Sequence, residues 1–347
     1  MRELKARGYD IRSISPWTPR HRPPQGWERK LQYVLRIPAL LRASRTPGTV
    51  IYTADLPWVR VLSMLRRLGF LRKQRIVAHW GGIDFDPRST EQEPYRRKFE
   101  QLFSALDVIW VASENERQIW SRTLPELGPR MAFHPMFVDL AYYRQIEPAT
   151  LIHDVVAIGS DSRRDWDLPI QLAARGLNVA LVTEDMDVRR RIQSLPIATS
   201  RNITLVFRAG FQQSARIAAA ARCLLVATTP NYRFSGSTTL GVAIALKRPL
   251  VIDDPFDMPA YGMKAGIDYE SFERGSSASA HAAVHRILSD PDHAIALAHA
   301  IAEKSDAVAM DAFVDRLEAS FLADWTANGA NELSSVPAKS QMVAAWP

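Results

Sequence analysis

Short runs of apolar and β-branched residues recur along this 347-residue chain, and the stretches between them have the spacing of helices. This alternation is typical of repeated strand and helix units, which assemble into a mostly parallel sheet flanked by helices. In the first half, the runs occupy residues 10–15, 49–53, 75–79, 107–112 and 130–134. The series begins again in the second half, at residues 154–160, 178–183, 202–207, 223–229 and 249–253. The pattern predicts an α/β protein with two sheets.

The restart of the series divides the chain into two Rossmann-like domains. A polar stretch that contains a proline, YYRQIEPATLIHD, lies between the two series and is typical of a linker. We predict a first domain at residues 1–150 and a second domain at residues 151–325. The remaining residues, 326–347, are mostly small and polar, and we predict that they form a disordered tail.

The first domain begins in an unusual way. The residues ELKARGYDIRSIS read as the end of a first helix followed by a second strand, and no strand with a glycine-rich turn precedes them. A Rossmann unit normally starts with such a strand and turn. Either translation naturally starts upstream, or the first domain lacks its first strand; we favour N-terminal truncation.

Basic residues are concentrated in the first domain. Residues 1–150 hold 25 Lys and Arg against 15 Asp and Glu, whereas residues 151–347 hold 19 against 22. An anionic surface is therefore the expected partner, and an anionic lipid leaflet is favoured. Nucleic acid is disfavoured because the chain lacks the base-stacking motifs of RNA-binding modules. A basic face that serves only solubility is the alternative.

The composition fits a folded protein without membrane-spanning helices. Hydrophobic residues make up 47% of the chain and charged residues 23%, as in ordinary globular proteins. The single cysteine, Cys223, requires no oxidising compartment. No run reaches the roughly 18 apolar residues of a spanning helix, and no secretory signal follows Met1. We predict a cytoplasmic protein, with peripheral contact at the inner face of the plasma membrane through its basic first domain.

The strongest functional signal lies between Cys223 and Asp253. A buried strand ends near Thr228, and after a loop the residues SGSTT open a helix of small side chains. The amides and the dipole of a helix N-terminus attract anions, and hydroxyl groups beside them add donors. We predict that a diphosphate is held by Ser235, Gly236, Ser237, Thr238 and Thr239. An ordinary Ser/Thr helix cap is the alternative.

A second anion site is predicted where the strand VVAIG ends, because open α/β sheets bind ligands beyond the carboxyl ends of their strands. Gly159 permits a turn there, and Arg163 and Arg164 can pair with the same diphosphate. Arginines exposed on the surface are the alternative. The loop lacks the second and third glycines of G-x-G-x-x-G, which disfavours a nicotinamide or flavin cofactor. We predict no cofactor and no metal.

In these features the chain resembles the GT-B glycosyltransferases, and within them the family 4 bacterial sugar transferases. The segment SGSTTLGVAIALKRPLVIDD resembles their nucleotide-diphosphate loop, helix and following strand. IVAHWGGID, ALDVIWVASENER and FHPMFVDLAYYR resemble successive parts of their acceptor domain and domain junction. The resemblance spans residues 1 to about 325. It implies two Rossmann-like domains that face a cleft, the first binding an acceptor and the second a nucleotide-diphosphate sugar.

The chain departs from this family pattern at the ribose. Many relatives carry a glutamate in the helix after the diphosphate loop, and here Val242 or an apolar neighbour stands in its place. Glu184 and Asp185, which end the next strand, are candidates to bind the nucleoside instead. A solvated pair of loop residues is the alternative. The family's lysine near Arg163 and Arg164 is also missing.

The resemblance directs the search for catalytic residues to the end of RIVAHWGGID. Asp84 is the candidate base for the acceptor hydroxyl, and His79 is the second candidate or a hydrogen-bond donor to the sugar. Gly81 and Gly82 let the backbone approach the acceptor, and His134 also ends a strand of this domain. A turn carboxylate and strand-end histidines without catalytic roles are the alternatives.

The resulting prediction is a metal-independent glycosyltransferase. It moves a sugar from a nucleotide-diphosphate sugar to the hydroxyl of an acceptor sugar or lipid-linked glycan, in the synthesis of a cell-surface polysaccharide or glycolipid. Two alternatives stay open. One is an epimerase of the same fold that acts on the nucleotide sugar itself. The other is a non-catalytic partner subunit, which the missing glutamate and missing first strand would suit.

Overall fold

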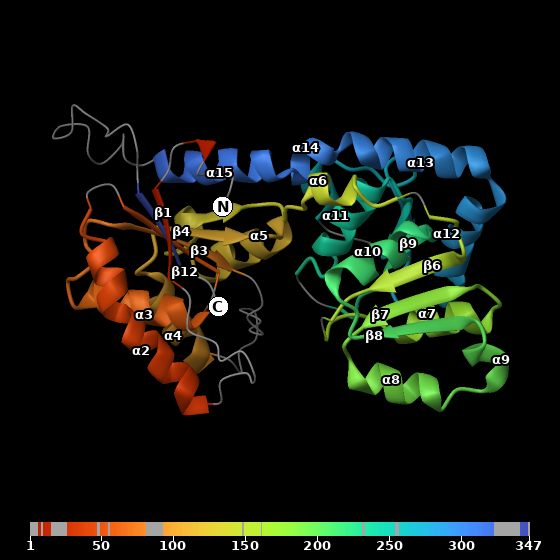
Figure 1. Cartoon of the computed structure of the whole chain (residues 1–347), viewed down its shortest axis with the longest axis horizontal. Helices are drawn as coiled ribbons and strands as arrows, with labels where there is room; N and C mark the ends of the chain where they lie inside the picture. The colour runs from red at the N-terminus through yellow and green to blue at the C-terminus, as the bar shows by residue number, and fades with distance from the viewer. Residues whose placement is uncertain are drawn as a thin grey trace. The chain divides into compact units, whose positions relative to one another are not determined.

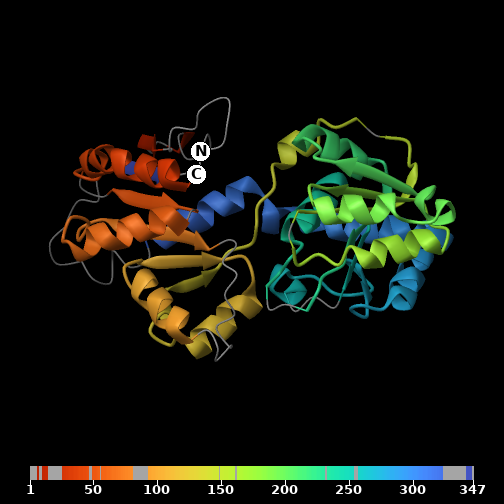
Figure 2. The same ribbon diagram turned by 90° about the horizontal axis from the view of Figure 1, so that it is seen from below.

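The computed structural model describes residues 6–7, 10–14, 26–46, 49–54, 56–80, 93–147, 149–160, 162–230, 233–253, 257–322 and 341–345. The chain forms two compact units, which we call unit 1 (residues 1–134 and 314–347) and unit 2 (residues 135–313). Each unit contains a six-stranded sheet in which all neighbouring strands run parallel. Figures 1 and 2 show each sheet with its own helices around it. The predicted α/β class with two Rossmann-like domains is confirmed.

Unit 1 alternates strands and helices from its first strand onward. Its elements are β1 (Asp10–Ile14), α2 (Gly26–Ala43), β2 (Val50–Thr53), α3 (Leu56–Arg67), β3 (Arg75–Trp80), α4 (Glu93–Phe103), β4 (Val108–Val111), α5 (Glu114–Thr123), the 3-10 turn η2 (Gly128–Arg130) and β5 (Met131–Phe133). The chain returns to this unit through α15 (Met310–Leu322) and ends in β12 (Gln341–Ala345). Arg7 holds α15 by ion pairs with Asp315 (2.5 Å) and Glu318 (2.8 Å).

Unit 2 repeats the alternation. Its strands are β6 (His153–Ile158), β7 (Val179–Thr183), β8 (Ile203–Phe207), β9 (Ala221–Val226), β10 (Leu250–Asp253) and β11 (Glu270–Phe272). Its helices are α6 (Leu140–Tyr143), α7 (Asp167–Ala174), α8 (Met186–Gln193), α9 (Ile197–Ser200), α10 (Phe211–Ala219), α11 (Ser237–Leu246), η3 (Met258–Tyr261), α12 (Ser277–Ser289), α13 (Pro291–Glu303) and α14 (Ser305–Val308). Strands β7 and β10 are buried along their whole length, which is why the sequence pattern shows continuous apolar runs there, whereas the edge strand β8 is only partly buried.

The strand orders explain the unusual start of the first domain. In unit 2 the order is β11-β10-β9-β6-β7-β8, so the first strand, β6, lies between the second strand, β7, and β9. In unit 1 the order is β1-β12-β2-β3-β4-β5. The position of a first strand, between β1 and β2, is occupied by β12 from the end of the chain. Met342 pairs with Ile11 on one side and Val50 on the other.

Two features of the division differ from the sequence prediction. Residues 341–345, which we predicted to lie in a disordered tail, form a central strand. Without this strand, β1 and β2 would each have an unpaired edge facing the other, and β12 pairs with both. The boundary lies at residue 134 rather than 150, because Val138 already packs in unit 2. Its amide donates to the Val308 carbonyl (2.9 Å), and its Cβ lies 3.2 Å from where Gly241 would carry a side chain.

Two negative findings concern the described part of the chain only. No helix in it is long and apolar enough to cross a membrane. The residues that the structure describes also contain no group of three His, Cys, Asp or Glu side chains suited to hold a metal ion.

Candidate functional site

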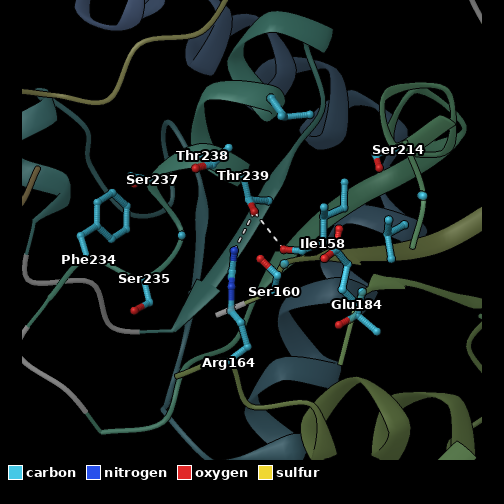
Figure 3. Close-up of a pocket in the computed structure, with 16 residues that line it drawn as sticks. Ile158, Ser160, Arg164, Glu184, Ser214, Phe234, Ser235, Ser237, Thr238 and Thr239 are labelled. Atoms are coloured by element: carbon cyan, nitrogen blue, oxygen red, sulfur yellow. Dashed lines mark hydrogen bonds between the residues drawn. The ribbon is translucent and has the colours of Figure 1, made fainter. Parts of the chain in front are cut away.

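A pocket of about 340 Å³ lies in unit 2 at the carboxyl ends of β6 and β7 and the N-terminus of α11 (Figure 3). This is the edge of a parallel sheet at which α/β proteins bind ligands. The pocket is lined by Ile158, Gly159, Ser160, Arg164, Val182, Thr183, Glu184, Ala209, Ser214, residues 234–239 and Val242. Backbone amides, hydroxyl groups and one guanidinium therefore surround the same space.

The turn into α11 depends on Gly236. Its φ angle of 148° lies in a region that side chains rarely adopt, and a Cβ there would lie 2.5 Å from Cγ1 of Val226 in β9. The glycine thus lets the first turn of the helix lie directly on the sheet. Beyond its first turn, the side chains of α11 are apolar on all sides, and Leu240, Ala243 and Ile244 are buried. The helix N-terminus is consequently fixed, with its polar first turn at the pocket.

Arg164 is the one cationic side chain among the described residues that line the pocket. Its Nη2 donates to Oγ1 of Thr239 (2.8 Å), and Thr239 Oγ1 in turn donates to the carbonyl of Ile158 (3.3 Å) (Figure 3). Arg164 also forms a backbone bridge with Thr228, and a Cβ on Gly159 would lie 2.9 Å from its Nε. Its residue is only 8% exposed. The guanidinium is held in place before any ligand arrives.

These groups together suit an anion with several oxygens. A fixed guanidinium, the amides of a helix N-terminus and the hydroxyls of Ser237 and Thr238 all offer donors or positive charge. Ser235 is also buried, with 6% of the residue exposed. Its hydroxyl oxygen has no hydrogen-bond partner among the described residues. A buried polar group without a partner marks a place where a ligand or water completes the bonding.

Most of the predicted donor-site residues converge on this pocket. Gly159, Arg164, Glu184 and all five residues of SGSTT line it. Two do not. Asp185 is the N-cap of α8, where its carboxylate accepts from the amides of Asp187 (2.8 Å) and Val188. The backbone carbonyl of Arg163 accepts from Thr229, and its side chain is absent from the lining.

Besides Val242, seven of the lining residues were not predicted as parts of the site: Ile158, Ser160, Val182, Thr183, Ala209, Ser214 and Phe234. Ser160 follows Gly159 directly and was within reach of the loop argument. Phe234 packs edge-on against Tyr261 at 5.4 Å beside the predicted motif. Ser214 lies on α10 and Ala209 just before it, and neither carries a local signal, because only the fold brings this region to the pocket. Val242, identified as the position of the missing glutamate, also lines the pocket.

The predicted acceptor residues belong to unit 1. His79 lies in β3 opposite Trp110 of β4. His134 is buried, and its ring lies 4.2 Å from the Trp110 ring at an interplanar angle of 31°. This contact with a core tryptophan gives His134 a packing role. Gly81, Gly82 and Asp84 lie outside the described residues.

Asp253 is a buried carboxylate beyond the pocket. Its Oδ2 accepts from the amide (2.9 Å) and hydroxyl (2.7 Å) of Thr228 and from Nε of Arg274 (3.0 Å). Burial raises the pKa of Asp253 above its ordinary value, although these bonds oppose the rise. The carboxylate ties the end of β9 to the end of β10, which is a structural task.

We expect Gly236→Ala to destabilise the protein by roughly 2–4 kcal/mol, since the new Cβ meets Val226 in a backbone conformation that is unfavourable for alanine. Chemical denaturation measures the change. Gly210→Ala is the matched control, because Gly210 has a φ of −66° and a Cβ there would meet nothing within 4 Å. Equal stabilities of the two variants would contradict the assigned role of Gly236.

Burial lowers the pKa of His79 to about 4, from an ordinary value of 6.5. The unfolded chain then binds the proton more tightly than the folded protein, so the free energy of unfolding falls as the pH decreases from about 6.5 to about 4. We expect His79→Gln to lose less stability than the wild type over that interval in urea titrations. Identical pH profiles would rule out a neutral, buried His79. A pKa this low also favours a hydrogen-bonding role over that of a base.

No protein-family model matches the chain, and no curated protein matches it in sequence. Solved structures do resemble it. HepE of Anabaena, solved in complex with UDP-glucose, has a TM-score of 0.67 at 12% identity, covering 86% of this chain and 84% of HepE. Sucrose-phosphate synthase of Thermosynechococcus elongatus has a TM-score of 0.68 at 16% identity, covering 90% and 81%.

A third similar structure is the UDP-forming α,α-trehalose-phosphate synthase of Burkholderia vietnamiensis, with a TM-score of 0.63 at 14% identity, covering 86% of this chain and 77% of the synthase. The three share the GT-B architecture of two Rossmann-like domains. The chain therefore has the GT-B glycosyltransferase fold. Membership of family 4 in particular stays a prediction.

Proposed function

We propose that this protein is a glycosyltransferase that takes a sugar from a UDP-type nucleotide sugar and attaches it to an acceptor hydroxyl. The observation that carries the proposal is the Arg164 guanidinium, fixed by Thr239 at the N-terminus of α11 in a pocket of the donor-binding unit. Two of the similar structures support it, since HepE was solved with UDP-glucose and the trehalose-phosphate synthase is UDP-forming.

In the proposed reaction, stabilising the negative charge on the leaving diphosphate matters more than a strong base. The acceptor oxygen forms a bond to the anomeric carbon as the bond from that carbon to the diphosphate breaks, and the diphosphate leaves with the electron pair. Arg164, the amides at the start of α11 and the hydroxyls of Ser237 and Thr238 meet the negative charge that develops there. This supply of positive charge supports a metal-independent reaction. Asp84 is the proposed acceptor of the hydroxyl proton.

Unit 1 is proposed to present the acceptor, an acceptor sugar or lipid-linked glycan, in polysaccharide or glycolipid synthesis. Its sequence holds the excess of basic residues, which supports peripheral contact with an anionic membrane at the inner face of the plasma membrane. Glu184 is proposed to contact the nucleoside, since it lines the pocket where Val242 replaces the family's glutamate.

The proposal is tested with a panel of UDP-, GDP- and ADP-sugars. We expect one UDP-sugar to raise the melting temperature of the full chain, because a ligand that binds only the folded state stabilises it by about 2.7 kcal/mol at a hundred times its Kd. That sugar is then incubated with the protein, with and without candidate acceptors. Transfer that requires an acceptor supports the proposal.

The same experiment separates the alternatives. A sugar that is altered without any acceptor would identify an epimerase. Absence of binding to every nucleotide sugar, by calorimetry as well as by melting, would favour a non-catalytic partner subunit, the alternative that the apolar Val242 supports.

A further inference from the structure

A second hollow, of about 710 Å³, lies in unit 1 at the amino-terminal edge of its sheet. Val50 and Arg75, the first residues of β2 and β3, border it, as do Asp107 and Arg130, which directly precede β4 and β5. This edge is opposite to the one at which α/β sheets usually bind their substrates. We call it the basic hollow, after the five cationic side chains that line it: Arg66, Arg72, Lys73, Arg75 and Arg130.

Asp107 is the one carboxylate among the described residues that line the basic hollow, and its Oδ2 accepts two hydrogen bonds. Oδ2 of Asp107 accepts from Nη1 of Arg66 (2.7 Å) and from the amide of Ile76 (2.7 Å). Arg66 also donates to the carbonyls of Ala105 (2.7 Å) and Gln74 (3.1 Å). Asp107 therefore serves to position Arg66 and does not neutralise the remaining cations.

Among the described residues, Arg130, Arg72 and Lys73 form no ion pair that would neutralise their charge. The guanidinium of Arg130 donates to the carbonyls of Ser104 and Leu106 (2.9 Å), which are neutral acceptors. Arg72 and Lys73 are exposed, and neither is in an ion pair with any residue that the structure describes. Hydrogen bonds thus hold the Arg66 and Arg130 guanidinium groups in place, and two exposed cations line the same hollow. This arrangement is suited to binding a phosphate group.

Exposed apolar side chains lie on the turn that leads to Arg72 and Lys73, where a Cβ on Gly69 would lie 3.5 Å from Nε of Arg72. Between the end of α3 and the start of β3, Leu68 is 64% exposed and Phe70 is 58% exposed, and Met64 on the last turns of α3 is 46% exposed. Gly69, with a φ of 90°, makes the turn between Leu68 and Phe70. Surfaces that enter a membrane interface typically combine large exposed apolar side chains with neighbouring cations, as this turn does.

We propose that the basic hollow binds the phosphate headgroup of an anionic phospholipid while Leu68 and Phe70 enter the bilayer interface. The complementary charge and the exposed apolar pair both point to this occupant. A nucleic acid backbone would use the cations but would leave the aliphatic side chains of Leu68 and Met64 in water. The inference gives a location to the membrane contact proposed above, and it does not depend on the transfer reaction.

The test is co-sedimentation of the full chain with vesicles, without nucleotide sugar. Vesicles of phosphatidylcholine are compared with vesicles that also contain phosphatidylglycerol, at low and high salt. We expect binding to require phosphatidylglycerol and to weaken with salt. Arg72→Glu with Lys73→Glu should weaken binding at least about tenfold. Leu68→Ser with Phe70→Ser should weaken it several-fold and leave a binding component that salt removes completely.

The matched control changes the same residue types in unit 2, Ile197→Ser with Arg201→Glu, where Ile197 is 84% exposed. It should bind vesicles like the wild type, and circular dichroism melting verifies that all three variants are folded. Equal vesicle binding by wild type and charge-reversed variant would overturn the proposal. So would binding of inorganic phosphate or of a short RNA at the hollow by a wild type that binds no vesicles.

Discussion

Replacing Arg164 with methionine should lower kcat/KM for transfer from the nucleotide sugar by a factor of about 10² to 10³, the usual cost of removing one group that stabilises charge in the transition state. Methionine keeps most of the length and packing of the arginine stem but removes the charge and the fork of donors. Because the diphosphate carries its greatest charge as it leaves, the loss should fall on kcat as well as on KM. Steady-state kinetics with the donor sugar identified by the ligand panel measures both.

Two further variants separate binding of the diphosphate from packing. Arg164→Lys keeps the charge without the planar fork and should recover part of the activity. Thr239→Val removes the hydroxyl that accepts from Arg164 at 2.8 Å, and it should cost less, about tenfold, because the guanidinium remains. If Arg164 only packed the loop, the methionine variant would melt earlier yet bind UDP with unchanged affinity in calorimetry. That result would contradict the proposal that this pocket binds the diphosphate.

The sheets were predictable from the sequence because most of their strands are apolar runs, and β2, β4, β7 and β10 are buried along their whole length. All ten predicted strands are present, and their bounds differ from the observed ones by three residues or fewer. β11 was missed because ESF is three residues long and carries no periodicity. β12 was missed for another reason. The strands that pair with β12 lie more than 280 positions earlier in the sequence, and the small, polar residues that precede β12 are typical of a disordered tail.

The candidate donor site was predictable in part. The Gly159 loop and the residues of SGSTT each follow a strand in the sequence, and parallel strands bring such ends to one edge of the sheet. What the sequence does not contain is the direction of each side chain. The sequence does not distinguish the two neighbouring arginines, Arg163 and Arg164. In the structure, Arg164 forms a backbone bridge with Thr228, and its side chain lines the pocket. Glu184 and Asp185 separate likewise, because Asp185 caps α8.

The position of β12 makes the last residues of the chain essential to unit 1. The strand pairs in parallel with β1 through five residues and with β2 through four, so removing it leaves two sheet edges unpaired in the middle of the unit. Deletion of residues 341–347 should therefore remove a large share of the roughly 5–15 kcal/mol that stabilises a domain, and unit 1 should unfold. Unit 2 has its own complete sheet and should remain folded.

Limited proteolysis with mass spectrometry distinguishes these outcomes, because a protected fragment close to residues 135–313 should persist while unit 1 is digested. Deletion of residues 346–347 alone is the matched control, since it leaves the strand whole. A second variant keeps the chain length: Val343→Pro removes an amide from a strand that is bonded on both sides, whereas Val343→Thr retains it. Proline should mimic the deletion and threonine should not. A proline variant with unchanged melting and unchanged digestion would show that β1 and β2 hold together without β12, and the slot between them would then need another occupant.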